Sequence, residues 1–129
     1  MIETVKIPQA GEFDEYVKAH PRAHMMQTSM WGKVKKEWDW TGFICRDLSG
    51  NIKGEMGVLI RQIPMTPFKM MYAPRGPVCD LSDKDTVTEL IKAVADYGQI
   101  QALPEDSIRI HIYKNEKVIF DFARNLLFA

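Results

Sequence analysis

The chain has 129 residues, 46% hydrophobic and 26% charged, which is typical of one soluble domain with its own core. Its 17 basic and 17 acidic residues cancel, so no overall positive field favours nucleic acid, and we expect no DNA partner. No apolar run approaches a membrane span, the first residues lack a signal-peptide pattern, and two cysteines are too few for a disulfide framework. We therefore expect a single domain over residues 1–129 in a reducing, cytoplasmic setting.

Two short helices are predicted first. Residues 11–19 form one, which a proline ends because proline cannot continue a helix. The second begins at Thr28 or Ser29, either of which can cap it, and runs to about residue 38. Its apolar positions, spaced i, i+3 and i+7, are Trp31, Val34 and Trp38. This stripe predicts that both tryptophans are largely buried.

Alternating and turn-rich sequence predicts strands next. Residues 43–46 and 52–63 form an antiparallel hairpin, joined by the turn chemistry of residues 47–51. A loop leads to a third strand over residues 69–73, ended by a proline. The predicted hairpin and third strand form one antiparallel meander.

A longer helix and two further elements complete the prediction. The helix runs from about Ser82 to Gly98, and its apolar face comprises Val87, Leu90, Ile91 and Val94. Residues 108–113 alternate as a strand, and residues 117–128 form a final helix that is apolar on most sides. Missing sequence or a protein partner is expected to cover that segment. The predicted fold class is α/β (α+β), with helices packed on a mixed, mainly antiparallel sheet.

Histidines and cysteines provide only weak candidate sites. His20 and His24 have the H-x-x-x-H spacing of a zinc-binding helix, but a proline lies between them and no third ligand is near. We interpret them as solvated loop histidines and expect no metal. Cys45 and Cys79 are interpreted as buried, inert thiols; the alternative is a nucleophile with His111 as its base. The phosphate-binding and nucleophile-elbow glycine motifs are absent, and no cofactor is expected.

A basic cluster and a rigid loop are the candidates for anion binding. Lys33, Lys35 and Lys36 lie on the second predicted helix, with Lys35 beside the apolar stripe, where it can edge a groove. The alternative is a solvated helix face. Residues 72–78, Tyr-Ala-Pro-Arg-Gly-Pro-Val, place Arg75 on a loop stiffened by two prolines. Such an arginine suits phosphate or carboxylate recognition, and the alternative is an exposed arginine on a rigid turn.

Both stretches resemble segments of the FemABX peptidoglycan aminoacyltransferases. Residues 27–35, Gln-Thr-Ser-Met-Trp-Gly-Lys-Val-Lys, followed by Trp38, are similar to the family segment Q-[ST]-x-x-W-[GA]-x-[VL]-K. Residues 72–80, Tyr-Ala-Pro-Arg-Gly-Pro-Val-Cys-Asp, are similar to Y-[AI]-[PS]-[RK]-G-P-[VL]-x-D. The likeness extends from about residue 10 to about residue 113.

This resemblance implies the N-terminal, GNAT-like half of a two-domain enzyme. Such an enzyme transfers an amino acid from aminoacyl-tRNA to the stem peptide of a peptidoglycan precursor, lipid II or its UDP-linked form, building the interpeptide bridge of the bacterial cell wall. The coenzyme A loop [RQ]-x-x-G-x-[GA] is absent, which argues against a small-molecule acetyltransferase. Lys35 matches the family lysine that contacts the precursor's phosphates. Our candidate substrate-binding residues are Lys35, Arg75, Tyr72 and Lys33, with no catalytic residue assigned.

The chain also departs from the family pattern. A strand that ends R-[IF]-D-P in the family reads Arg-Ile-His-Ile here, so His111 replaces an acidic residue that helps line the precursor cleft. The second half is absent, and we expect the isolated chain to be inactive. A lipid-linked precursor would allow a peripheral membrane contact. The alternative function is a non-catalytic interaction module of GNAT-like fold that docks through residues 117–128.

Overall fold

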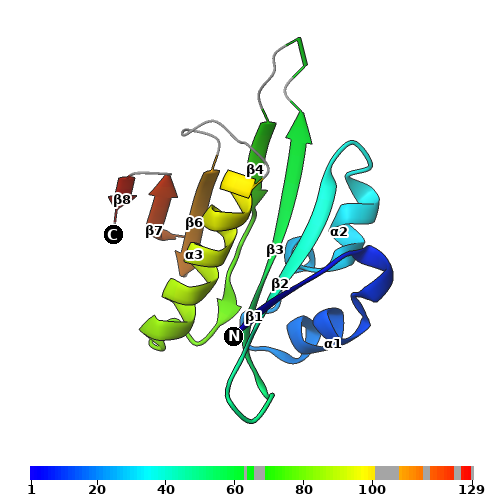
Figure 1. The fold of residues 1–129 in the computed structure, drawn as a ribbon. Coiled ribbons are helices and arrows are strands. Elements are labelled where there is room, and N and C mark those ends of the chain that lie inside the picture. Colours follow the sequence, from blue (N-terminus) through cyan, green and yellow to red (C-terminus); the bar gives the residue numbers. More distant parts are fainter. Residues whose placement is uncertain (63, 66–68, 101–107, 115–116, 124–125, 129) are drawn as a thin grey trace.

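The computed structural model describes residues 1–62, 64–65, 69–100, 108–114, 117–123 and 126–128, with the backbone only for residues 62, 69–70 and those beyond 98. Within these residues, eight strands form one mixed sheet with helices on both faces (Figure 1). The strands are β1 (Ile2–Val5), β2 (Asp39–Arg46), β3 (Ile52–Gln62), β4 (Lys69–Ala73), β5 (Val78–Cys79), β6 (Ile108–Lys114), β7 (Lys117–Ala123) and β8 (Leu126–Phe128). The α-helices are α1 (Gly11–Ala19), α2 (Ser29–Val34) and α3 (Lys84–Ile100), and single 3₁₀ turns are η1 (Ile7–Gln9) and η2 (Met25–Gln27).

The strand order confirms the predicted fold class. Neighbouring strands follow the order β1-β2-β3-β4-β6-β7-β8, and β5 pairs with a separate part of β3. All these pairs are antiparallel except β4–β6, which is parallel because α3 carries the chain across one face between them. The predicted β2–β3 hairpin is confirmed. Its turn is closed by the Asp47 carboxylate, which accepts hydrogen bonds from the N–H groups of Ser49 and Asn51 at 2.9 and 3.0 Å.

The two faces of the sheet have separate cores. The α3 face, which α3 covers, buries side chains that alternate along β3 with those of the other face. Its buried members are Phe43, Cys45, Met56, Val58, Ile60, Met71, Ala73, Leu90, Ile91 and Val94. The α1/α2 face, which α1 and α2 cover at β2 and β3, has a smaller core (Figure 1). Its buried members are Ala10, Phe13, Val17, Trp40, Ile44, Leu59 and Val78.

Helix α3 confirms the predicted stripe but not the predicted end. Asp83 caps the helix: its carboxylate accepts from the Thr86 N–H at 3.2 Å and from the Thr86 hydroxyl at 2.6 Å. Gly98 was expected just past the last turn, yet the helix continues to Ile100. Gly98 is buried, so packing against the sheet offsets the low helix propensity of glycine.

The predicted helix over residues 117–128 is wrong. These residues contain β7 and β8, which pair antiparallel with each other. β7 also pairs antiparallel with β6, from Arg109–Ala123 to Lys114–Lys117. The β-branched and aromatic residues of 118–122 favour an extended strand, and pairing with β6 decides in its favour. A docking helix at the end of this chain is therefore excluded.

Strands β1 and β5 were not predicted. β1 pairs with β2 from Ile2–Cys45 to Val5–Gly42, across about forty residues of sequence. β5 contributes only two pairs, Gly54–Cys79 and Glu55–Val78. Segments of two to four residues carry too little periodicity to be recognised, and their partners lie far along the chain.

Candidate functional site

Helix α2 is shorter than predicted and changes the surroundings of Lys35. The helix ends at Val34, and Lys35 is its C-terminal cap, with its N–H bonded to the Trp31 carbonyl at 2.9 Å. The Trp38 N–H then bonds to the Lys35 carbonyl at 2.9 Å, so the chain turns towards β2. The predicted stripe does not exist, because Val34 is 57% exposed and Trp38 lies outside the helix.

The deeply buried indole is Trp40, not the predicted pair. Trp31 and Trp38 are only partly buried at the border of the α1/α2 core, so the prediction of largely buried side chains is wrong in extent. Trp40 is 3% exposed and meets the Phe13 ring edge-on at 5.0 Å. Gly42 and Gly57, paired across β2 and β3, leave room for this indole: a Cβ at Gly42 would lie 2.6 Å from it.

Cations stack on the two outer tryptophans. The Lys35 Nζ lies 5.1 Å from the centre of the Trp31 ring, and the Arg61 guanidinium lies 5.8 Å from that of Trp38. Arg61 also forms an ion pair with Glu37 at 3.0 Å. The two contacts of Arg61 hold the turn after α2 against β3. Lys33 and Lys36 are exposed, as is Lys35. The predicted basic cluster therefore faces solvent.

The rigid loop between β4 and β5 places Arg75 in an unusual backbone conformation. Arg75 has a φ of 63°, the left-handed region that non-glycine residues rarely adopt. Pro74, Gly76 and Pro77 around it are buried, whereas Arg75 itself is half-buried. A Cβ at Gly76 would lie 2.8 Å from the amide oxygen of Gln27, so a larger residue there would displace that side chain or the loop.

Gln27 joins the two candidate stretches. Its fully buried side chain donates from Nε2 to the Pro74 carbonyl at 2.6 Å and to the Gly57 carbonyl at 3.1 Å. Its Oε1 accepts from the Gly57 N–H at 2.9 Å. The residue that opens the first motif is therefore hydrogen-bonded to the loop of the second. This role of Gln27 could not be predicted from the sequence, because its partners Gly57 and Pro74 are distant along the chain and meet it only in the folded structure.

The α1/α2 face carries Tyr72 as well. Tyr72 pairs with Leu59, which belongs to the α1/α2 core, and cross-strand partners share a face. Its side chain is 43% exposed, beyond the part of the sheet that α1 and α2 cover. Lys35, the Gln27-bound loop and Tyr72 are thus associated with one face. We also predict from the sequence that Lys35 and Arg75 border one common groove, and this stays a prediction.

The comparisons with known proteins identify the family. The FemAB family model matches residues 9–112, which include both motifs and the hydrogen bonds of Gln27 that join them. The chain belongs to the FemAB family. It is 33% identical over 102 residues to the lipid II:glycine glycyltransferase of Staphylococcus epidermidis, covering 78% of this chain and 24% of that protein. With the protein of the same description from Staphylococcus haemolyticus it shares 35% over 82 residues, 63% of this chain and 20% of that protein.

A solved structure agrees with the family assignment. The structure titled "Crystal structure of FemX" superposes with a TM-score of 0.73 and 25% sequence identity. The match covers 84% of this chain and 27% of that one. The chain therefore spans about a quarter of the length of the relatives it matches. Among the described residues, no helix has both the length and the hydropathy that a membrane span requires.

In this FemAB-family chain the two histidines of the H-x-x-x-H pattern support turns. The Nδ1 of His20 accepts from the Arg22 N–H at 3.0 Å, and the Nδ1 of His24 accepts from the Met26 N–H at 3.1 Å. Where side chains are described, no three metal-ligating side chains come together. The His111 side chain lies outside the described set, so its expected effect on the precursor cleft stays a prediction.

The two thiols are buried and protonated. Burial raises the pKa of Cys45 to about 11, and its thiol donates a hydrogen bond to Glu89 at 3.3 Å. Burial likewise raises the pKa of Cys79 to about 12. A thiol must ionise to act as a nucleophile, so both are inert at neutral pH, as interpreted from the sequence.

A buried carboxyl group under α1 was not anticipated. Glu55 is fully buried on the α1/α2 face, paired across strands with Ile44 and Val78. Neither of its oxygens has a hydrogen-bond partner in the described part of the chain. Burial, reinforced by the charges of Glu12 and Asp14, raises its pKa to about 9, so the group is neutral at pH 7. Nothing in the sequence of the predicted strand indicates that the carboxyl group at this position is buried.

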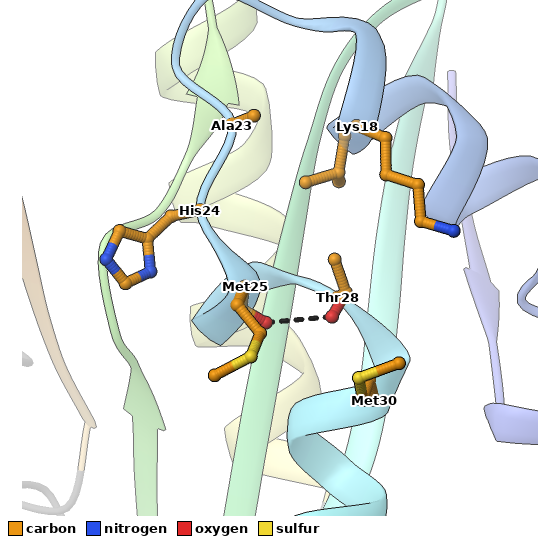
Figure 2. A pocket seen from close by; sticks show the side chains of 7 residues that line it. Lys18, Ala23, His24, Met25, Thr28 and Met30 are labelled. Atoms are coloured by element: carbon orange, nitrogen blue, oxygen red, sulfur yellow. Dashed lines mark hydrogen bonds between the residues drawn. The ribbon is translucent and has the colours of Figure 1, made fainter.

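Two surface hollows flank the turn between α1 and α2. One, of about 330 Å³, is mostly apolar and lies between α1, η2 and α2 (Figure 2). Met25 and Met30 line one side of it, and the Thr28 hydroxyl donates to the Met25 carbonyl at 2.8 Å beside them. The other, of about 520 Å³, lies between the segment after α1 and that after β5, with His20, Arg22 and Asp80 in its lining.

Proposed function

We propose that this chain is the N-terminal, GNAT-like domain of an enzyme that transfers an amino acid from aminoacyl-tRNA to the stem peptide of a peptidoglycan precursor. The family match over residues 9–112 carries this proposal. The relatives named lipid II:glycine glycyltransferase point to the same substrate class and to interpeptide bridge formation. Buried free cysteines accord with a reducing, cytoplasmic site of action.

Anion recognition is the role proposed for the α1/α2 face. Lys35 and Arg75 would contact the precursor's phosphates, because ammonium and guanidinium groups form charge-assisted hydrogen bonds with phosphate oxygens. Lys33 would add positive charge from the exposed surface of α2. Tyr72 would offer its partly exposed ring and hydroxyl to the sugar or peptide part of the precursor.

The chemical step proposed for the whole enzyme is aminolysis of an ester. The free amine of the stem peptide attacks the aminoacyl ester carbonyl, the carbon–oxygen bond to the tRNA breaks, and the tRNA hydroxyl leaves with a proton. Such a reaction depends mainly on positioning and on stabilising the oxyanion. The basic cluster of this domain, Lys33, Lys35, Lys36 and Arg75, is small for a tRNA, whose binding requires many phosphate contacts. We therefore assign tRNA binding to the remainder of the enzyme and no catalytic base to this domain.

A titration tests the proposal. The chain is titrated with a UDP-linked muropeptide at two salt concentrations, beside a transfer assay with charged tRNA. We expect weak, salt-sensitive binding and no transfer, because the few cations of this face neutralise only a pyrophosphate. Transfer by the isolated chain would contradict the division of labour between domains. Binding that is absent, or unchanged in a Lys35→Ala, Arg75→Ala double variant, would contradict the phosphate site.

A further inference from the structure

The side chain of Gln27 occupies a gap in the sheet. β4 pairs with residues 59–62 of β3 and β5 with residues 54–55, so neither strand reaches residue 57. The Gln27 amide takes the place of the missing strand there. It forms hydrogen bonds with both the N–H and the carbonyl of Gly57, as a backbone partner would. Its Nε2 group also donates a hydrogen bond to the Pro74 carbonyl. Because a Cβ at Gly57 would lie 2.9 Å from the Gln27 carbonyl oxygen, the approach is close.

The loop held by this amide stores backbone strain. A non-glycine residue in the left-handed region costs about 1 kcal/mol or more, and it persists only where the surroundings fix it. Arg75 is such a residue, and it lies between Pro74, whose carbonyl Gln27 binds, and Gly76, which packs against the same amide. The Gln27 side chain therefore contacts the loop on both sides of Arg75, in addition to the backbone hydrogen bond from the Gly76 N–H to the Ala73 carbonyl at 3.4 Å.

We propose that Gln27 is a positioning residue for anion recognition: it holds the loop 74–77 in the conformation that presents the Arg75 guanidinium to the precursor's phosphates. This inference rests on the proposed function, since it requires that Arg75 bind phosphate. It adds that the first motif contributes to binding twice, through Lys35 directly and through Gln27 by way of Arg75. Gln27 itself is fully buried, so it acts through the loop and not by direct contact with the precursor.

Two variants separate positioning from mere stabilisation. Gln27→Met keeps the length of the side chain and removes all three hydrogen bonds. Gly76→Ala leaves the hydrogen-bonding groups intact but places a methyl group 2.8–3.0 Å from the amide atoms, so the amide and the loop must move apart. Asp83→Ala is the control: it removes the cap of α3 on the opposite face and lowers stability without reaching the loop.

The measurement is the dissociation constant for the UDP-linked muropeptide, with the unfolding midpoint recorded for every variant. We expect Gln27→Met and Gly76→Ala each to weaken binding about tenfold, the usual effect of losing a hydrogen bond to a charged group, and Asp83→Ala to leave binding unchanged. Because Gln27 acts through Arg75, a Gly76→Ala, Arg75→Ala double variant should bind no more weakly than Arg75→Ala alone. Gly76→Ala keeps the test valid if Gln27→Met does not fold.

The outcomes distinguish this inference from the function on which it rests. If Arg75→Ala weakens binding but the Gln27 and Gly76 variants do not, the positioning role is overturned and the phosphate site stands. Additive losses in the double variant would also overturn it, since they would mean that Gly76 acts independently of Arg75. If neither Arg75→Ala nor Lys35→Ala alters binding, the phosphate site falls, and the positioning role falls with it.

Discussion

The two faces of the sheet are built in different ways. On the α3 face, apolar side chains of β2, β3 and β4 meet the apolar stripe of α3, and contacts follow from sequence periodicity. On the α1/α2 face, glycines open space for Trp40, a buried amide replaces a strand partner, and an acid lies without a hydrogen-bond partner in the described part. The first face supplies stability mainly by the burial of apolar side chains. The α1/α2 face contains buried polar groups and a strained backbone, both of which lower stability. Such features are typical of a functional surface.

The largest expected effect on stability comes from a substitution in the core of the α3 face. Leu90→Ala removes a fully buried side chain and leaves a cavity, which costs about 2–5 kcal/mol in unfolding free energy. Leu48→Ala is the matched control, because Leu48 is fully exposed in the hairpin turn and should give no measurable change. Denaturant titration checks both. Equal effects of the two substitutions would contradict the assignment of Leu90 to the core.

The next effect concerns the acid of the α1/α2 face and depends on pH. The pKa of Glu55 is about 9 in the folded chain against an ordinary 4.5, so the unfolded chain releases the proton first. Its contribution to stability is complete below pH 4.5 and is lost as the pH rises towards 9, by up to about 1.4 kcal/mol per pH unit. Glu55→Gln should remove this loss, so the stability of the variant relative to the native chain rises with pH. Parallel stability curves between pH 5 and 8 would show that Glu55 is ionised in the folded state.

A smaller effect compares two aspartates with the same task on opposite faces. Asp14 of α1 accepts from the Ser29 N–H at 2.8 Å and the Ser29 hydroxyl at 2.5 Å, and so fastens the start of α2. Asp83 caps α3 in the same manner. Asp14→Ala and Asp83→Ala should lower the unfolding midpoint by similar amounts. Only Asp14→Ala should weaken muropeptide binding, because α2 carries Lys35. Equal muropeptide binding by the two variants would mean that binding does not depend on the hydrogen bonds between Asp14 and Ser29.

The smallest effect on stability is expected at Lys35. Its side chain is exposed and stacks on a partly buried ring, so Lys35→Ala should leave the unfolding midpoint unchanged within error while weakening muropeptide binding. Lys92→Ala, an exposed lysine of α3, should change neither quantity. A clear loss of stability in Lys35→Ala would assign this lysine a structural role instead.

The same contrast explains how much the sequence could predict. The alternation of Met56, Val58 and Ile60 and the stripe of α3 follow local rules, and the structure confirms both. The second helix was predicted four residues too long. The helical spacing of apolar residues continued to Trp38 in the sequence, whereas the chain leaves the helix after Val34 to enter β2. The last segment was predicted as a helix because apolar content was weighed above strand propensity.

The candidate site shows the same division. The two motifs were recognised from their residues, and the family match confirms the recognition. What joins them was not predictable, because Gln27 contacts residues 30 and 47 positions away. The raised pKa of Glu55 was equally unpredictable. A strand pattern indicates on which face a side chain lies, but not how deeply it is buried or which charged groups lie near it. Individual roles in ligand binding stay predictions.

Strand β1 occupies an edge of β2 that would otherwise be open to pairing with another chain. It forms one edge of the sheet and covers β2, whose segment Phe43-Ile44-Cys45 is buried and rich in strand-forming residues. β1 itself is a poor template for another chain, being four residues long with an exposed Glu3 that pairs with Arg46 at 2.7 Å. Removing the first five residues would expose the edge of β2. Such a truncated chain should self-associate through that edge while the rest of the fold persists.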